Sequence, residues 1–271
     1  MRIIYGKSKW GAEALGLEAF LEKARAGGFG ATEINLTEIE ASPAECVALH
    51  RGLGLAQVAQ LVIDGDTVDA QRRFLDTWFP RALLFEPIMI NLHTGRDFFT
   101  FEENLGLFEH INGLGRDVGV SVVHETHRGR ALYSAVETRR YLEACPELYL
   151  NADISHWMVV QESDLANQAE TIALAGRRTR YIHARVGYEQ GPQVTDPRAP
   201  EWAGHLENHL AFWRGVIEAR RAAGDDFLVI TPEYGPPAYM HTLPFTNQPV
   251  SDTWGVNVVM MEILRERLGR D

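Results

Sequence analysis

The chain has 271 residues, of which 45% are hydrophobic and 23% charged, a balance typical of a globular protein with a large core. Its net charge of −11 argues against a broad contact with nucleic acid or an anionic membrane. No apolar run of about 18 residues and no signal-peptide pattern is found, and two cysteines exclude a disulfide framework. We therefore expect a cytoplasmic protein with no nucleic-acid or membrane partner. The sequence leaves open whether it forms a homo-oligomer.

Short apolar runs recur eight times, at separations that accommodate a strand, a helix and their loops. Helical periodicity occurs between several of them, in residues 12–26, 105–118, 135–144, 164–175 and 206–222. Strands that alternate with helices form a parallel sheet, and eight repeats fit a closed (β/α)8 TIM barrel better than an open sheet. We expect this barrel to be one domain, residues 1–271. The apolar runs are centred near Ile3, Ile34, Val58, Ile90, Val122, Leu150, Ile182 and Val229.

Polar residues stand at the carboxyl ends of the expected strands, where (β/α)8 barrels carry their active sites. The fifth to eighth strands end in Glu125, Asp153, His183 and Glu233, respectively. Three carboxylates that converge with one imidazole repel one another unless a cation joins them. Hard oxygen ligands with one nitrogen suit Mn²⁺, Mg²⁺ or Co²⁺, and Zn²⁺ is an alternative. Four protein ligands leave two positions of a six-coordinate ion for water or for two adjacent sugar oxygens.

Each of these residues taken alone has a simpler explanation. A carboxylate at a strand end often caps the next helix or pairs with a cation, and a buried histidine often belongs to the core. Four such residues in register on consecutive strands favour the metal site instead. His124 directly precedes Glu125 and points to the opposite face of the strand, so we expect it to be structural.

This residue set resembles the xylose isomerase-like TIM-barrel superfamily, which includes sugar epimerases of the D-tagatose 3-epimerase type, hydroxypyruvate isomerase, inosose dehydratase and endonuclease IV. The D-x-x-H motif Asp153-Ile-Ser-His156 is its most specific local match. The resemblance extends from the first strand to the last helix. It implies that Glu125, Asp153, His183 and Glu233 are metal ligands.

The resemblance also implies roles in chemistry and in binding. Glu125 and Glu233 match the acid/base pair of the 3-epimerases, and His156 matches a histidine that contacts the substrate. In those enzymes an arginine follows the metal-binding histidine by six residues. Here Glu189 holds that position, and the nearest arginine is Arg185. We therefore expect Arg185 to contact the substrate in a different arrangement, which disfavours ordinary ketohexose epimerisation.

Further substrate contacts are expected from His93, at the end of the fourth strand, and from Arg128, in the segment that follows Glu125. Arg96 and Arg130 also lie near these strand ends. A guanidinium group there can bind a carboxylate, a phosphate or several hydroxyls. The sequence therefore leaves open whether the substrate is acidic, phosphorylated or neutral.

The sequence favours a metal-dependent isomerase or epimerase that acts on a sugar or keto-sugar through an enediolate. Elimination by a keto-sugar or cyclitol dehydratase, or by a 3-keto-glycoside lyase, uses the same proton abstraction and is an open alternative. An endonuclease IV-like nuclease is disfavoured because further histidine ligands are missing, with Gln60-Leu61-Val62 ending strand three and Arg198 in place of a histidine. A barrel that binds sugar without turnover is the remaining alternative.

Overall fold

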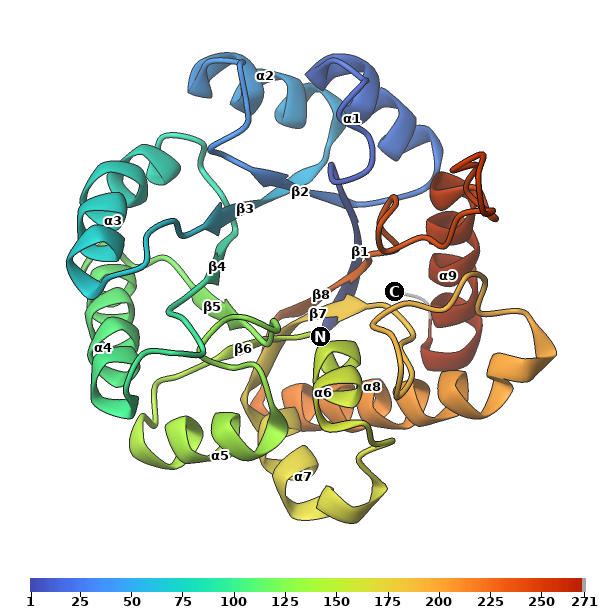
Figure 1. Cartoon of the computed structure of the whole chain (residues 1–271). Coiled ribbons are helices and arrows are strands. Elements are labelled where there is room, and N and C mark those ends of the chain that lie inside the picture. Colours follow the sequence, from blue (N-terminus) through green and yellow to red (C-terminus); the bar gives the residue numbers. More distant parts are fainter. Residues whose placement is uncertain (270–271) are drawn as a thin grey trace.

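Eight parallel strands close into a barrel in which each strand pairs with its neighbours in chain order, β1 to β8 (Figure 1). The computed structural model describes residues 1–269, so the last two residues of the expected domain lie outside the described part. The predicted (β/α)8 barrel is confirmed. The strands are β1 (Arg2–Ser8), β2 (Ala31–Asn35), β3 (Ala56–Val62), β4 (Met89–His93), β5 (Val122–Glu125), β6 (Leu150–Ala152), β7 (Thr179–Ala184) and β8 (Phe227–Pro232).

Helices surround the barrel and connect successive strands (Figure 1). They are α1 (Leu17–Ala26), α2 (Pro43–Leu53), α3 (Val68–Leu83), α4 (Phe101–Val118), α5 (Ala135–Ala144), α6 (Ile154–Gln161), α7 (Ala169–Arg178), α8 (Ala203–Ala223) and α9 (Thr253–Leu268). Two short 3₁₀ turns, Ala166–Gln168 and Pro200–Trp202, precede α7 and α8. Among residues 1–269, no helix combines the length and the apolar character needed to cross a membrane.

Some predicted helix boundaries are wrong for local reasons. The helix expected over residues 12–26 begins only at Leu17, because Gly16 has an extended backbone with ψ 161°. The helix expected from residue 105 begins earlier, at Phe101. There the Thr100 side chain accepts from the Glu103 backbone N–H, and the Glu103 side chain accepts from that of Thr100, a capping box that satisfies backbone donors at the helix start.

The barrel interior consists of an apolar layer covered by a polar layer. The apolar layer includes Ala31, Val58, Met89, Val123, Tyr181 and Val229, all buried. Alternate residues of a strand point to the same face, so the residue two positions further lies above each of them, closer to the carboxyl end. By this rule Glu33 lies above Ala31, Asn91 above Met89, Glu125 above Val123 and His183 above Tyr181. We call this carboxyl end of the barrel the mouth.

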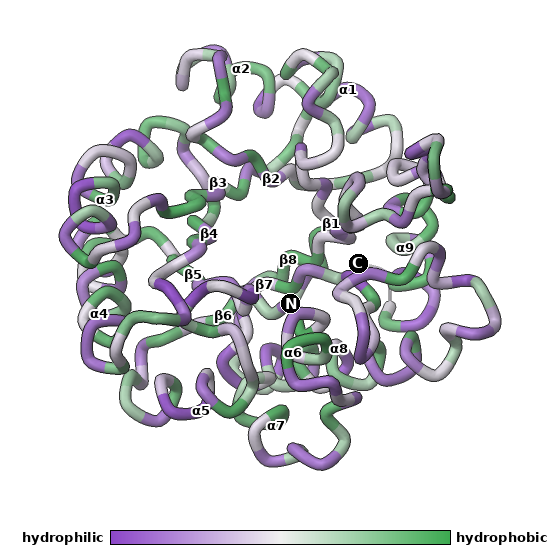
Figure 2. Tube along the Cα trace, in the orientation of Figure 1, coloured by the Kyte–Doolittle hydropathy of each residue, from purple (hydrophilic) through white to green (hydrophobic). Residues whose placement is uncertain are grey.

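A second apolar region lies between the strands and the ring of helices. Helix α1, for example, buries Phe20, Leu21 and Ala24 against the barrel, while its remaining residues are more exposed. The ring helices accordingly carry both hydrophobic and hydrophilic residues along their length (Figure 2). This packing holds the strand ends in fixed positions and thereby fixes the polar side chains of the mouth.

Candidate active site

His183 lies at the centre of the polar layer and faces three buried carboxylates. Its Nε2 is 2.9 Å from Glu33 Oε2. Its Nδ1 is 3.1 Å from Glu233 Oε2 and 3.4 Å from Glu125 Oε2, but it has no hydrogen-bond partner in the described part of the chain. Because a carboxylate can only accept, the Nε2 hydrogen is donated to Glu33. In the neutral ring, Nδ1 therefore directs a lone pair toward two carboxylates.

Glu125 is held by neighbours on the adjoining strands. Asn91 Nδ2 donates to Glu125 Oε2 and to Glu33 Oε1, each at 2.9 Å, and thus links two carboxylates of the polar layer. His93 Nε2 lies 2.8 Å from Glu125 Oε2, and Asn151 Nδ2 donates to the same oxygen at 3.3 Å. These contacts fix the carboxylate beside His183 Nδ1.

The carboxylates strongly perturb the titration of His183. Burial alone lowers its pKa, but Glu233, Glu33 and Glu125 outweigh burial and raise the pKa well above the usual value. For Glu125, burial raises the pKa, while His93 and His183 outweigh it and hold the pKa well below the usual range. With no ion bound, the carboxylates therefore favour a proton on Nδ1, and a cation that binds Nδ1 would take the place of that proton.

A divalent cation fits this position. Glu33, His183 and Glu233 bring donor atoms within 4.8 Å of one another. A histidine that binds a metal through one ring nitrogen commonly donates the other N–H to a carboxylate, and Glu33 is placed for that task. Glu125 and Glu233 then stand beside the free nitrogen. We read Glu125, His183 and Glu233 as the residues that would hold the ion, with Glu33 behind them.

Asp153, the fourth expected ligand, is engaged elsewhere. It caps helix α6, because its Oδ1 accepts from the backbone N–H of Ser155 at 3.0 Å and from the Ser155 hydroxyl. Its Oδ2 accepts a hydrogen bond from Arg185 Nη2. Both oxygens are thus occupied, as in the simpler explanation given above for a strand-end carboxylate. The structure brings three of the four expected ligands together and places Asp153 against Arg185.

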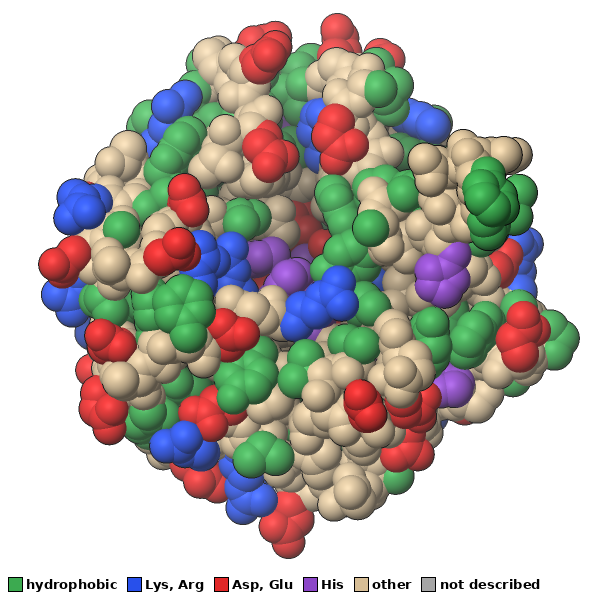
Figure 3. Space-filling model, viewed as in Figure 1, with side chains coloured by type: hydrophobic (Ala, Val, Ile, Leu, Met, Phe, Trp, Pro, Cys, Tyr) green, Lys and Arg blue, Asp and Glu red, His purple; other side chains and the backbone are tan. Residues whose placement is uncertain are grey.

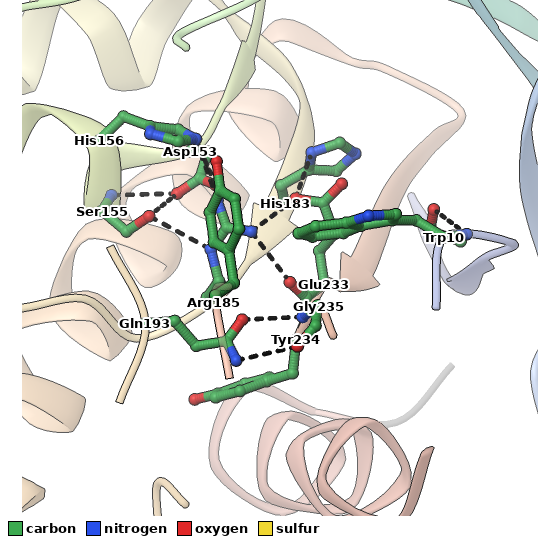
Figure 4. Close-up of polar contacts among 12 residues, drawn as sticks. Trp10, Asp153, Ser155, His156, His183, Arg185, Gln193, Glu233, Tyr234 and Gly235 are labelled. Carbon is green, nitrogen blue, oxygen red and sulfur yellow. Dashed lines mark hydrogen bonds and ion pairs between the residues drawn. The ribbon is translucent and has the colours of Figure 1, made fainter. Parts of the chain in front are cut away.

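Arg185 lies between Asp153 and Glu233, which follow the strands on either side of β7 (Figure 4). Besides Asp153, its guanidinium group contacts Glu233, with Nη1 3.3 Å from Oε2 and 3.2 Å from the main-chain oxygen. Its carbon Cζ lies 4.7 Å from the centre of the Tyr239 ring and 5.8 Å from that of Trp10. The guanidinium therefore positions Glu233 and is covered by aromatic rings.

A cavity of about 1040 Å³ opens above these residues. Its wall contains Glu125, Glu233 and Arg185 from the site, while Trp10 and Tyr239 come from the loops. Figure 3 shows the mouth as a hollow with His, Asp or Glu, and Lys or Arg side chains around it. Within the described residues, His183, Asp153 and Glu33 are not part of the cavity wall. A substrate in the cavity would therefore meet the two glutamates first.

The other expected substrate contacts have different positions. His93 lies in the cavity wall beside Glu125. His156 is fully buried and outside the described cavity wall, with its Nε2 3.0 Å from Arg185 Nη2. Arg128 places its guanidinium 5.1 Å from the centre of the Tyr239 ring and is likewise not found in the described wall. His124, expected to be structural, points away from the site and contacts Thr94 and Asn112.

Glu33, Asn91 and His127 have no role predicted from the sequence, and the structure places them in or beside the site. Glu33 and Asn91 occupy inward positions two residues beyond an apolar residue of the barrel interior, which is a signal that the sequence does carry. His127, together with His93 and Glu125, forms a second group of donor atoms within 4.8 Å of one another. Its Nδ1 donates to the main-chain oxygen of Arg128, and its Nε2 lies 3.3 Å from the Tyr239 hydroxyl.

No protein-family model matches the chain, and no curated protein matches it in sequence. Solved structures match it over nearly the whole length. A probable 3-DHS dehydratase from Bacillus anthracis has a TM-score of 0.62 at 15% identity, covering 97% of this chain and 98% of its own. Endonuclease IV from Thermus thermophilus has a TM-score of 0.61 at 16% identity, covering 98% of each chain.

A third similar structure is a xylose isomerase-like TIM barrel protein from Mycobacterium smegmatis in complex with magnesium. Its TM-score is 0.61 at 12% identity, and the match covers 99% of this chain and 98% of that one. At such identities the likeness establishes the fold alone. The chain therefore has the xylose isomerase-like TIM barrel fold, and the resemblance noted in its sequence is confirmed at that level.

Proposed function

We propose that the chain is a metal-dependent isomerase or epimerase that acts on a sugar or keto-sugar through an enediolate. The observation that carries the proposal is the position of His183 Nδ1, buried between Glu125 and Glu233 beneath a large cavity. Bound Mn²⁺, Co²⁺ or Mg²⁺, with Zn²⁺ as an alternative, would polarise a substrate carbonyl and acidify the neighbouring C–H. Asp153 would join the ligands if Arg185 released it.

The residues of the cavity wall divide the remaining work. Glu233 is held by Arg185 and Glu125 by Asn91 and His93, so both carboxylates are presented to the cavity in fixed positions. One glutamate removes the proton next to the carbonyl, and the same or the other glutamate returns it. Return by the same residue to the neighbouring carbon gives isomerisation. Return by the second residue to the opposite face gives epimerisation.

The cavity itself suits a small polyhydroxylated substrate. Trp10 and Tyr239 offer aromatic surfaces to the C–H face of a sugar, while Gln60 and His93 offer hydrogen bonds. The rim carries Glu13, Glu18, Glu38, Glu40 and Glu45. This acidic rim and the net charge of −11 favour a small-molecule substrate over the phosphate backbone of a nucleic acid.

Elimination by a dehydratase or lyase is a second candidate, and one observation favours it. A leaving hydroxyl or alkoxide needs a proton, and the Tyr239 hydroxyl lies in the cavity wall with His127 Nε2 3.3 Å behind it. Because His127 Nδ1 donates to the Arg128 main chain, Nε2 is an acceptor for the tyrosine hydroxyl, which must rotate away from Nε2 to donate its proton to the leaving group. Proton abstraction by a glutamate is common to both candidates.

Incubation of the Mn²⁺-loaded protein with a panel of keto-sugars in D₂O tests the proposal. We expect deuterium to enter the carbon next to the carbonyl, and Glu233→Gln to slow that exchange by about 10²–10⁴-fold. A new conjugated carbonyl absorbance would identify elimination. Product without solvent deuterium would overturn the enediolate in favour of a hydride shift, and binding with neither exchange nor product would indicate a non-catalytic barrel.

A further inference from the structure

Arg130 is a cation of the cavity wall that none of the steps above uses. It lies in the segment between β5 and α5, yet its side chain crosses to the ends of two other strands. Nη1 donates to the main-chain oxygen of Ile63 at 2.6 Å and to that of His93 at 3.3 Å. The segment itself is fixed, because the backbone N–H of Ala131 donates to Thr94 at 3.2 Å. The guanidinium is therefore held in one place at the β3–β4 side of the cavity.

Arg130 forms no ion pair with the described part of the chain, although Glu125, Asp64 and Asp66 attract its charge from further away. Within residues 1–269, no carboxylate oxygen lies within 4.0 Å of its guanidinium nitrogens. Asp64 and Asp66 pair with Arg96 instead. By contrast, the buried Arg185 contacts two carboxylates. A partly buried guanidinium without a counter-ion is costly, and burial lowers its pKa to about 10.

The free hydrogen-bond donors and the single positive charge of Arg130 determine which kind of anion it can bind. Of five guanidinium N–H groups, the main-chain carbonyls occupy those on Nη1, which leaves Nε and Nη2 as a fork for two oxygens. A carboxylate matches such a fork in charge and in planar geometry. A phosphate monoester carries about two charges and is commonly bound by several cations or by a helix N-terminus. On this side of the cavity it would meet only the guanidinium of Arg130 among the described wall residues, because the neighbouring Arg96 pairs with Asp64 and Asp66 outside the wall, and the rim is acidic.

We propose that Arg130 binds a carboxylate of the substrate, so that the substrate class is a keto-sugar acid. This inference rests on the proposed function for the identity of the reacting centre. The contact chain gives the relative positions: Arg130 holds the His93 main chain, and the His93 side chain touches Glu125. The carboxylate would therefore sit on the β3–β4 side of the cavity, and the reacting carbon between Glu125 and Glu233.

The test compares ligands that share a carbon skeleton and differ only at carbon 6. D-Fructuronate, D-fructose and D-fructose 6-phosphate form one set, and D-tagaturonate, D-tagatose and D-tagatose 6-phosphate form another. Calorimetric titration of the Mn²⁺-loaded protein measures the six dissociation constants. A charged hydrogen-bonded pair predicts that the carboxylate member of at least one set binds about 10- to 100-fold more tightly than the hydroxymethyl and phosphate members.

Arg130→Gln should abolish this preference and leave the affinity for the neutral sugar within about twofold. Arg130→Lys, which keeps the charge but not the fork, should retain part of it and serves if the glutamine variant does not fold. Lys9→Gln is the matched control, because Lys9 is another cation of the cavity wall, at the β1 side. Equal affinities within both sets, including no measurable binding, would contradict the inference.

Three further outcomes are decisive. A preference for phosphate, or a carboxylate preference that is lost in Lys9→Gln but kept in Arg130→Gln, would also overturn the assignment. A carboxylate preference that depends on Arg130, found in a protein that catalyses no proton exchange, would leave this inference standing while the proposed reaction fails. The binding measurements therefore test the role of Arg130, and turnover separately tests the proposed reaction.

Discussion

At the residue scale, the 2.9 Å contact between Glu33 and His183 Nε2 determines which imidazole nitrogen faces the cavity side of the polar layer. Donation to Glu33 fixes the ring orientation and increases the basicity of Nδ1. The same carboxylate accepts from Asn91, which also holds Glu125. Glu33 thus positions two groups of the proposed metal site without entering the cavity wall.

Glu33→Gln should therefore weaken Mn²⁺ binding by about 10- to 100-fold, as is typical for loss of a carboxylate behind a metal-binding histidine. The measurement is titration of the metal-free protein with Mn²⁺, with unbound ion followed by its paramagnetic resonance signal. Glu147→Gln is the control, because Glu147 is an exposed residue that pairs with Arg116 on the surface. Unchanged affinity in Glu33→Gln would remove Glu33 from the site.

Arg185 allows a second prediction, because its guanidinium group pairs with Asp153, the carboxylate that was expected to bind the metal ion. Arg185→Gln leaves a buried carboxylate without its cation, and the metal-free variant should lose about 3–5 kcal/mol of unfolding free energy. A divalent ion should restore much of that loss, since Asp153 becomes free to ligate. Substrate affinity should fall, because Arg185 lines the cavity.

Chemical denaturation with and without Mn²⁺, together with metal analysis, checks this outcome. Loss of bound metal in Arg185→Gln would mean that the arginine braces the metal site rather than competing for Asp153. The double variant Asp153→Asn, Arg185→Gln separates the two effects, because it removes both charges. It should be more stable than Arg185→Gln alone when metal is absent.

At the element scale, all eight strands lie where the apolar runs predict them, because parallel strands buried on both faces form short continuous apolar segments. The loops of the mouth were not predictable in this way. Gln193 exchanges two hydrogen bonds with the backbone of Gly235, at 2.7 and 3.1 Å, and joins segments 42 residues apart. Contacts between loops so far apart in the sequence leave no periodic pattern, so the position of Tyr239 over Arg185 could not be predicted from the sequence.

The site residues also differ in how far their positions can be predicted. The positions of residues at strand ends, such as Glu125 and His183, follow from the barrel register alone. The partners of Asp153 do not, because Arg185 follows the next strand, β7, and its side-chain direction depends on packing beneath Trp10 and Tyr239. The position of Asp153 at the mouth is therefore predictable from the sequence, whereas its pairing with Arg185 is not.

Gly235 provides a prediction for these loops. A Cβ atom there would lie 1.9 Å from the Trp10 ring, which also packs edge-on against Tyr239 at 4.9 Å. Gly235→Ala should displace Trp10, lower the unfolding free energy by about 1–3 kcal/mol and weaken ligand binding. Gly215→Ala in α8 is the control, because nothing lies within 4 Å of its added Cβ. It should be neutral or slightly stabilising. Equal stability of the two variants would contradict this packing.

At the scale of the whole molecule, the barrel concentrates negative charge at one end of its interior. Glu33, Glu125, Asp153 and Glu233 are all buried there, with Arg185 as the cation that contacts two of them. An ion that binds only the folded barrel must raise its stability, by about 2.7 kcal/mol at a concentration 100-fold above the dissociation constant. For a chain of this size that corresponds to a rise of roughly 5 °C in Tm.

Thermal unfolding with increasing Mn²⁺ checks this prediction, and His183→Gln is the variant in which the rise should be lost. Mg²⁺ should act in the same direction at higher concentration. A Tm that does not depend on Mn²⁺, Co²⁺, Mg²⁺ or Zn²⁺ would contradict metal binding by the folded state.

The central claim, a single divalent ion between Glu125, His183 and Glu233, is tested most directly by anomalous diffraction from crystals soaked in Mn²⁺. We predict one strong anomalous peak at about 2.0–2.6 Å from His183 Nδ1 and from one oxygen of each glutamate. A peak confined to the group of His93, Glu125 and His127, or no peak in the barrel at saturating Mn²⁺, would contradict the claim.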